Sequence, residues 1–121
     1  MIKALKFVTI PTSDQDRALA FWTEKVGLRL LTDQPMGGEK RWIELAIPGA
    51  QTRIVLFTQE GHEGRIGTRF NGAFTCADVN YAYGQLVQKG VKFPELPTRQ
   101  RWGEFAVFQD EDDNSFVLSS K

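Results

Sequence analysis

FVTIPTSDQDRALAFW, residues 7–22, has a partner later in the chain, NGAFTCADVNYA, residues 71–82. Each segment begins with a run typical of a strand and continues to an Asp that can cap a helix. Asp14 and Asp78 are 78 − 14 = 64 residues apart, about half of the 121-residue chain. Each expected helix is followed by a glycine, Gly27 or Gly90, the residue that most often ends a helix. A repeat of this size predicts a duplicated module, because a solenoid needs three or more copies.

Hydrophobic periodicity and turn residues extend the two modules to the order β-α-β-β-β, twice. The fold class is therefore α+β, and we expect a curved mixed or antiparallel sheet around a cavity. Module one is expected at 1–60 and module two at 68–121, with a glycine-rich linker at 59–67 between them. Ser13 or Asp14 can cap the first helix. The predicted strands are 3–10, 28–32, 41–47, 53–58, 69–76, 92–96, 104–108 and 115–119, the predicted helices are 13–26 and 78–89, and 33–39 is predicted to be a loop.

Composition narrows the classes of function. Lys plus Arg and Asp plus Glu both number 15, so the formal charge is zero. A neutral chain disfavours nucleic acid as a partner and gives no support for an anionic membrane. Cys76 is the single cysteine and His62 the single histidine, which excludes an internal disulfide and a His-rich metal site within one chain. We expect His62 to lie in a solvated loop. No signal-peptide pattern or membrane-length apolar run is found, so we expect a cytoplasmic protein.

The ordered set of motifs resembles the vicinal oxygen chelate superfamily, which includes glyoxalases, bleomycin resistance proteins and extradiol dioxygenases. The resemblance covers nearly the whole chain and implies a single glyoxalase-like domain at 1–121. Bleomycin resistance proteins further imply a homodimer with ligand clefts built from both chains. The residues that carry the resemblance are Val8-Thr9-Ile10-Pro11, Asp14, Arg17-Ala18, Phe21-Trp22, Val26-Gly27, Ala73-Phe74, Asp78-Val79, Gly90-Val91 and the segment 110–118.

The resemblance also locates the four positions at which the metal enzymes of this superfamily carry His, Glu or Gln. Here they are Phe7, Val55, Asn71 and Val117. Neither Phe nor Val has a lone pair to donate, and Asn is a weak neutral ligand that suits hard cations. The chain is thus identified as a variant that lacks the metal ligands, with no metal site and no cofactor expected, which places the Lewis-acid chemistry of the family in doubt.

Strand alternation predicts which side chains face the cavity. Leu5, Thr9, Ala73, Ser115 and Ser119 share the cavity side with the four metal positions, while the intervening apolar residues pack under the helices. A mixed apolar and polar lining is typical of a small-molecule pocket. The ligand-binding candidates are Phe7, Trp42, Arg53, Val55, Phe57, Asn71, Trp102 and Val117.

Several of these candidates have a structural interpretation that stays open beside the functional one. Phe7, Val55 and Val117 can fill the space as a second core, and Arg53 can be a solvated strand end. An amide of Asn71 that faces inward can bond to backbone instead of a ligand. Trp102 either anchors its loop or offers a face for stacking. The side-chain directions of Trp102 and of Glu44 are open; a Glu44 that faces inward is a weak candidate for a general base.

Three functions compete on this evidence. The first is a metal-free protein that binds a small organic molecule, for which a planar or apolar ligand fits a neutral chain better than cationic bleomycin. The second is a glyoxalase-like lyase or isomerase that uses a carboxylate base (Glu44 or Glu104, with Arg53) or a non-standard metal site. The third is a structural or regulatory module with a filled cavity. Whether the protein is an enzyme, what its ligand is, and whether the modules pair within a chain or swap between chains are left open by the sequence.

Overall fold

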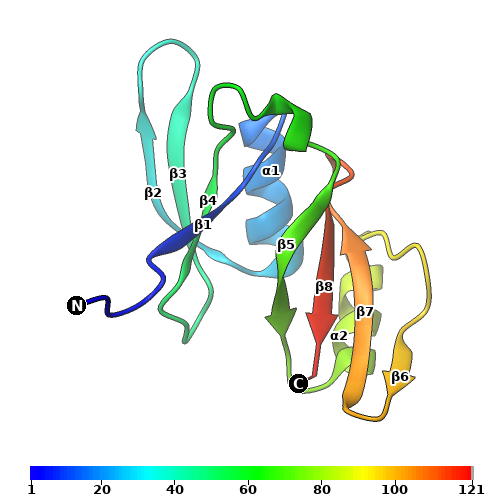
Figure 1. Cartoon of the computed structure of the whole chain (residues 1–121). Coiled ribbons are helices and arrows are strands. Elements are labelled where there is room, and N and C mark those ends of the chain that lie inside the picture. Colours follow the sequence, from blue (N-terminus) through cyan, green and yellow to red (C-terminus); the bar gives the residue numbers. More distant parts are fainter. Residues whose placement is uncertain (121) are drawn as a thin grey trace. The chain divides into compact units, whose positions relative to one another are not determined.

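Each half of the chain builds its own four-stranded mixed sheet with one helix. The computed structural model describes residues 1–120, and the chain divides into one unit at 1–66 and a second from Gly67 onward. The strand order is β1-β4-β3-β2 in the first unit and β5-β8-β7-β6 in the second (Figure 1). This confirms the α+β fold with two βαβββ modules.

The first unit contains β1 (Phe7–Ile10), α1 (Gln15–Ala20) with a π-helical continuation (Phe21–Val26), β2 (Arg29–Pro35), β3 (Arg41–Ala46), β4 (Arg53–Leu56) and a 3-10 turn (Glu63–Arg65). The second contains β5 (Arg69–Thr75), α2 (Val79–Gln88), β6 (Thr98–Gln100), β7 (Gly103–Gln109) and β8 (Ser115–Ser119). No helix within residues 1–120 has the length and apolar character needed to cross a bilayer.

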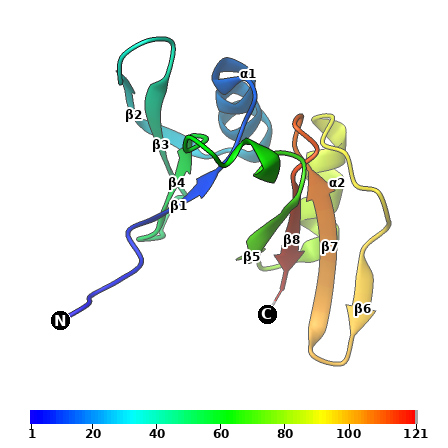
Figure 2. The same cartoon turned by 45° about the horizontal axis from the view of Figure 1, so that its top comes forward.

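The first and last strands of each module run parallel. Phe7 lies opposite Arg53 in the β1–β4 pair, and Ala73 lies opposite Val117 in the β5–β8 pair. The remaining neighbours are antiparallel. In the second unit, α2 covers one face of the sheet and leaves the other without a helix in both views (Figures 1 and 2).

The two helices begin and end in matching ways, as the repeat predicts. Asp14 accepts a hydrogen bond from the Arg17 backbone N–H, and Asp78 accepts one from the Tyr81 backbone N–H. Of the two candidates for the first cap, Asp14 rather than Ser13 takes the position. Gly27 and Gly90 follow the helices with φ of 95° and 89°, a left-handed conformation that favours glycine.

The apolar residues that alternate with the predicted cavity face form the cores. The buried set includes Ile10, Ile54, Leu56, Phe116 and Leu118, as well as Trp22 from the helical stripe. In the second unit the rings of Phe74, Phe108 and Phe116 contact one another at centroid distances of 5.2–6.3 Å. Burial of these side chains removes most of their apolar surface from water and stabilises each unit.

Two local predictions were wrong. Strand β2 runs to Pro35 instead of ending at residue 32, because its pairing with β3 continues to the Pro35–Arg41 pair; a proline fits there since β2 is an edge strand. Residues 92–96 form no strand; only Lys92 bridges to Gln109, and the sixth strand is Thr98–Gln100. The segment 59–67, predicted to be a linker, contains the 3-10 turn Glu63–Arg65.

A substitution at Gly72 tests how tightly the second unit is packed. A Cβ at this position would lie 2.8 Å from Cε2 of Phe70, whose ring stacks on Phe74 at 5.8 Å. Gly72→Ala therefore forces a packed ring to move, and we expect urea denaturation to show a loss of about 1–3 kcal/mol in the free energy of unfolding. Gly84→Ala is the matched control, because its new Cβ meets nothing within 4 Å in helix α2; it should be neutral or stabilise by up to about 1 kcal/mol. Equal losses in the two variants would contradict this packing.

Candidate functional site

Three aromatic side chains from three segments meet on the first sheet. Phe7 of β1 contacts Trp42 of β3 edge to face at a centroid distance of 5.4 Å. Phe57, directly after β4, also contacts Trp42, at a centroid distance of 5.5 Å. The strand register produces this meeting, since Phe7 pairs with Arg53 and Val55 pairs with Glu44, and side chains two residues apart share a face. We call Phe7, Trp42, Glu44, Arg53 and Phe57 the aromatic face.

Glu44 ties the polar atoms of the aromatic face together. Its Oε2 accepts a hydrogen bond of 2.8 Å from Trp42 Nε1, and its Oε1 accepts one of 2.9 Å from Arg53 Nη1. The Trp42 bond and then the Arg53 bond favour the carboxylate and hold the pKa of Glu44 below its usual value. Glu44 thus fixes the orientation of the indole ring, but its lowered pKa makes it a weaker proton acceptor.

The structure brings five of the predicted site residues together on the first sheet, and the same register places Val55 on that face, opposite Glu44. Glu44, whose direction the sequence left open, shares a face with Trp42 and Arg53. Val55 is fully buried, a position that fits its structural interpretation. In the second unit, Asn71 is exposed within an irregular part of β5, Val117 is half-buried on β8, and Trp102 lies in the turn between β6 and β7.

The residues at the four family metal positions do not fit a metal ion. Phe7 packs its ring on Trp42, and Val55 is a buried aliphatic side chain. Val117 likewise has no lone pair, which leaves the Asn71 amide as the single potential donor of the four. Within residues 1–120, no three His, Cys, Asp or Glu side chains are grouped as a metal site would require.

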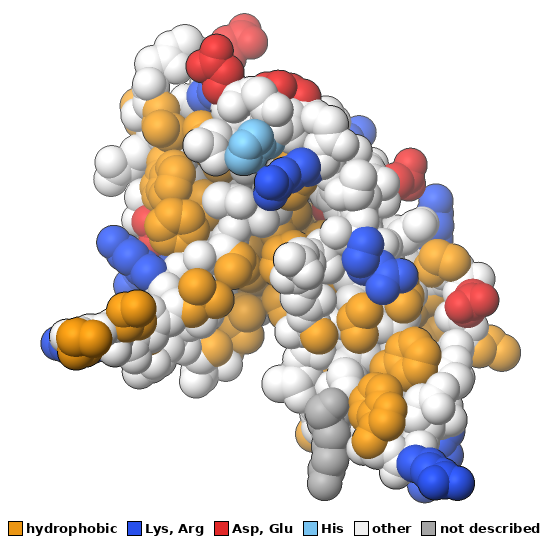
Figure 3. Space-filling view, viewed as in Figure 1, with side chains coloured by type: hydrophobic (Ala, Val, Ile, Leu, Met, Phe, Trp, Pro, Cys, Tyr) orange, Lys and Arg blue, Asp and Glu red, His pale blue; other side chains and the backbone are white. Residues whose placement is uncertain are grey.

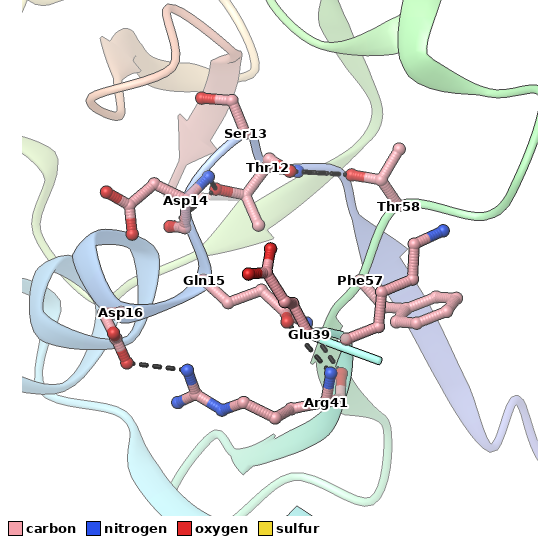
Figure 4. Close-up of a pocket in the computed structure, with 10 residues that line it drawn as sticks. Thr12, Ser13, Asp14, Gln15, Asp16, Glu39, Arg41, Phe57 and Thr58 are labelled. Atoms are coloured by element: carbon pink, nitrogen blue, oxygen red, sulfur yellow. Dashed lines mark hydrogen bonds and ion pairs between the residues drawn. The ribbon is translucent and has the colours of Figure 1, made fainter. Parts of the chain in front are cut away.

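A polar pocket of about 310 Å³ lies beside the aromatic face, where α1 begins and β3 starts (Figure 4). Gln15 donates through Nε2 to the backbone oxygens of Arg41 (2.7 Å) and Leu56 (2.8 Å). It also accepts from the Arg41 backbone N–H, and so links the helix start to two strands. Phe57 lines both this pocket and the aromatic face. Sequence reasoning missed Gln15 and Arg41, because a glutamine after a helix cap and an arginine at a strand start carry no specific signal.

The charges around this pocket compensate one another. Arg41 makes ion pairs with Asp16 (2.7 Å) and with Asp33 (3.0 Å). The hydrogen bond from Arg41 lowers the pKa of Asp33. Figure 4 shows the Arg41 guanidinium pointing toward Asp16 at the helix. The guanidinium of Arg41 is therefore neutralised by carboxylates of its own chain. Together with the hydrogen bonds of Gln15, these ion pairs link helix α1 to the strands of the first sheet.

The two βαβββ modules, each with a four-stranded mixed sheet, define the fold of the vicinal oxygen chelate class. The chain belongs to the Glyoxalase/Bleomycin resistance protein/Dioxygenase superfamily, whose family model matches residues 4–118. This confirms the resemblance found in the sequence.

Individual relatives agree with this membership. The uncharacterized protein YetH of Bacillus subtilis (strain 168) is 39% identical over 118 residues and covers 98% of both chains. A crystal structure of a superfamily member from Sphaerobacter thermophilus is 30% identical, has a TM-score of 0.87 and covers 98% of this chain and 97% of that one. TnmS3, described as an antibiotic binding protein from Streptomyces sp. CB03234, is 34% identical with a TM-score of 0.85, and the match covers 98% of this chain and 95% of TnmS3.

The contribution of Glu44 to stability can be measured as the pH dependence of the free energy of unfolding. Because its pKa is lowered in the folded protein, the stability it contributes is present above its ordinary value near 4.5 and is lost as pH falls through the folded-state pKa. Glu44→Gln should lower the free energy of unfolding at pH 7 by about 1.5–3 kcal/mol, the range for hydrogen bonds to charged groups. The difference from the wild type should shrink below about pH 4.

Urea denaturation at a series of pH values measures both effects. Glu60→Gln is the control, since Glu60 is exposed in the loop between β4 and the 3-10 turn of the same unit. A Glu44→Gln variant as stable as the wild type at pH 7 would mean that Glu44 does not hold the ring.

Proposed function

We propose that this protein binds a planar organic molecule on its aromatic face and holds it without chemical change. The observation that carries the proposal is Trp42, which contacts Phe7 and Phe57 and is oriented by its hydrogen bond to Glu44. A ring fixed before the ligand arrives loses little conformational freedom on binding, and so more of the contact energy appears as affinity. Aromatic rings also stack on planar ligands in offset or edge-to-face geometry.

The polar groups of the aromatic face give the ligand an orientation. Arg53 binds Glu44 through Nη1 while 49% of its side-chain surface remains exposed. Its remaining guanidinium N–H groups are suited to donate to a carbonyl or hydroxyl oxygen of a ligand. An apolar surface with a few fixed polar groups is the usual composition of a small-molecule site.

The comparisons support a binding role. TnmS3, 34% identical over nearly the whole of both chains, is described as an antibiotic binding protein. By analogy, we propose an antibiotic-like aromatic compound as the ligand class for this chain. A formal charge of zero favours a neutral or weakly charged compound over a strongly cationic one.

The state of Glu44 favours binding over catalysis at this face. A general base works best when its pKa lies near the operating pH. Glu44 is shifted in the opposite direction by Trp42 and Arg53, and both oxygens already accept hydrogen bonds. We therefore prefer a ligand-holding role to the lyase or isomerase alternative.

The expected cytoplasmic location and the homodimer remain part of the proposal, and sedimentation velocity of the purified protein measures the oligomeric state.

A ligand screen tests the proposed function. We expect a planar aromatic antibiotic to raise the thermal unfolding temperature, and a compound present at 100 times its Kd to stabilise the fold by about 2.7 kcal/mol. Divalent metals and thiol conjugates complete the panel. Trp42→Leu should weaken the compound about tenfold in calorimetry, because an aromatic pair contributes about 0.5–1.5 kcal/mol beyond its buried area. Tyr81→Leu, which removes an exposed aromatic side chain from α2, should leave the affinity unchanged.

Two results would contradict the proposal. The first is a panel in which no planar compound stabilises the wild type. The second is a compound recovered from the protein in altered form by mass spectrometry, since this outcome would favour an enzyme.

A further inference from the structure

The second unit has a pocket of its own, built from other residues than the aromatic face. It has a volume of about 500 Å³ and lies between the start of α2 and the β6–β7 hairpin. Its walls include Asp78, Arg99, Arg101, Trp102, Glu104 and Ser120. A volume of this size is within the range of small-molecule sites.

This pocket and the pocket beside α1 lie at corresponding places in the two modules. Asp14 and Asp78 cap the two helices and line the respective pockets. Arg41 and Gly103 each begin the third strand of their modules and line the respective pockets too. The repeated βαβββ fold therefore makes a hollow at this place in each unit.

The charges in the two pockets differ. In the first unit, Arg41 is taken up by Asp16 and Asp33. In the second, neither Arg99 nor Arg101 has an acidic side chain of residues 1–120 within ion-pair distance. Both arginines are exposed. Lys and Arg side chains gather next to β6, at the lower right of Figure 3. The duplicated hollow thus presents two guanidinium groups that no acidic side chain of residues 1–120 neutralises.

Trp102 supplies a flat apolar surface beside these arginines. Its ring stacks on Phe105 with a centroid distance of 5.9 Å and an interplanar angle of 19°. Although it is held by this stack, 51% of the residue stays exposed. Trp102 can therefore anchor its loop and also stack on a ligand, because Phe105 holds one side of the ring and the exposed surface can accept the ring of a ligand.

The acidic residues of the pocket are bound to the helix. Asp78 accepts from the Tyr81 backbone N–H as the helix cap, and Glu104 accepts from the Asn80 side-chain amide. These bonds direct part of each carboxylate toward α2, whereas Arg99 and Arg101 form no ion pair with an acidic side chain in the part of the chain that the structure describes. An anionic group would therefore be placed on the β6 side of the pocket.

We propose that this pocket binds a planar aromatic carboxylate, with its ring on Trp102 and its carboxylate on Arg99 and Arg101. Guanidinium groups hold carboxylates through short, charge-assisted hydrogen bonds, and the flat ring adds stacking. The proposal does not depend on the aromatic face of the first unit, which uses different residues.

Three probes test it with the full chain: 2-naphthoate, its neutral amide 2-naphthamide, and acetate. Titrations followed by ¹⁵N–¹H NMR should show saturable binding of 2-naphthoate, with shifts concentrated in residues 98–104. The amide and acetate should each bind at least about tenfold more weakly, since the first lacks the charge and the second lacks the ring. Arg99→Gln and Arg101→Gln should each weaken 2-naphthoate about tenfold, and Trp102→Leu should do the same. Arg29→Gln, at an exposed position of β2, is the matched control and should change nothing.

Several outcomes would overturn the proposal. One is that 2-naphthoate binds no more tightly than its amide, or shows no saturable binding below about 1 mM. Another is that the NMR shift changes are confined to residues of the first unit. A third is that the Arg99 and Arg101 variants bind 2-naphthoate as tightly as Arg29→Gln does. Sedimentation velocity of the same variants adds a further criterion: arginine variants that change the oligomeric state and leave naphthoate affinity intact would assign the arginines to an interface between copies. Trp42→Leu should retain naphthoate binding at residues 98–104, so that a failure of the aromatic face is distinguishable from a failure of this pocket.

Discussion

The parallel pairing of the first and last strands in each module is the constraint on which the rest of the structure depends. After β1, the chain must return before it can continue in the same direction, and α1 provides this return, as α2 does after β5. The helix needs an apolar surface to pack on, so one side of the sheet becomes core. The register that aligns Phe7 with Arg53, and Val55 with Glu44, then determines which side chains share the opposite face. The aromatic face is thus a consequence of strand pairing.

The sequence was most informative where one residue type has a single physical role. Asp14 and Asp78 accept from backbone N–H groups at the helix starts, and Gly27 and Gly90 take the left-handed conformation that ends the helices. Strand alternation similarly predicted the burial of Ile54 and Phe116, although Val55, which it assigned to the other face, is buried as well. These features depend on local conformation and on a period of two, both of which can be read without knowledge of distant contacts.

The sequence was least informative where a distant partner decides the outcome. Pro35 lies in a strand because Arg41 pairs with it, and neither residue indicates this alone. The direction of Glu44 follows from hydrogen bonds with Trp42 and Arg53, and the roles of Gln15 and Arg41 follow from contacts between a helix and two strands. Side-chain bonding of this kind leaves no periodic pattern in the sequence, so the candidate residues were found more easily than their interactions.

Glu44 also limits the chemistry that the aromatic face can support. A carboxylate that must both hold an indole ring and neutralise Arg53 is most useful when it stays ionised, and the two hydrogen bonds favour that form. The same bonds that pre-organise the ring therefore reduce the tendency of Glu44 to accept a proton. Removing either bond to restore basicity would release the ring or the arginine, so orientation and general-base catalysis compete for one side chain. The observed geometry thus favours orientation over proton transfer, as the proposed binding role requires.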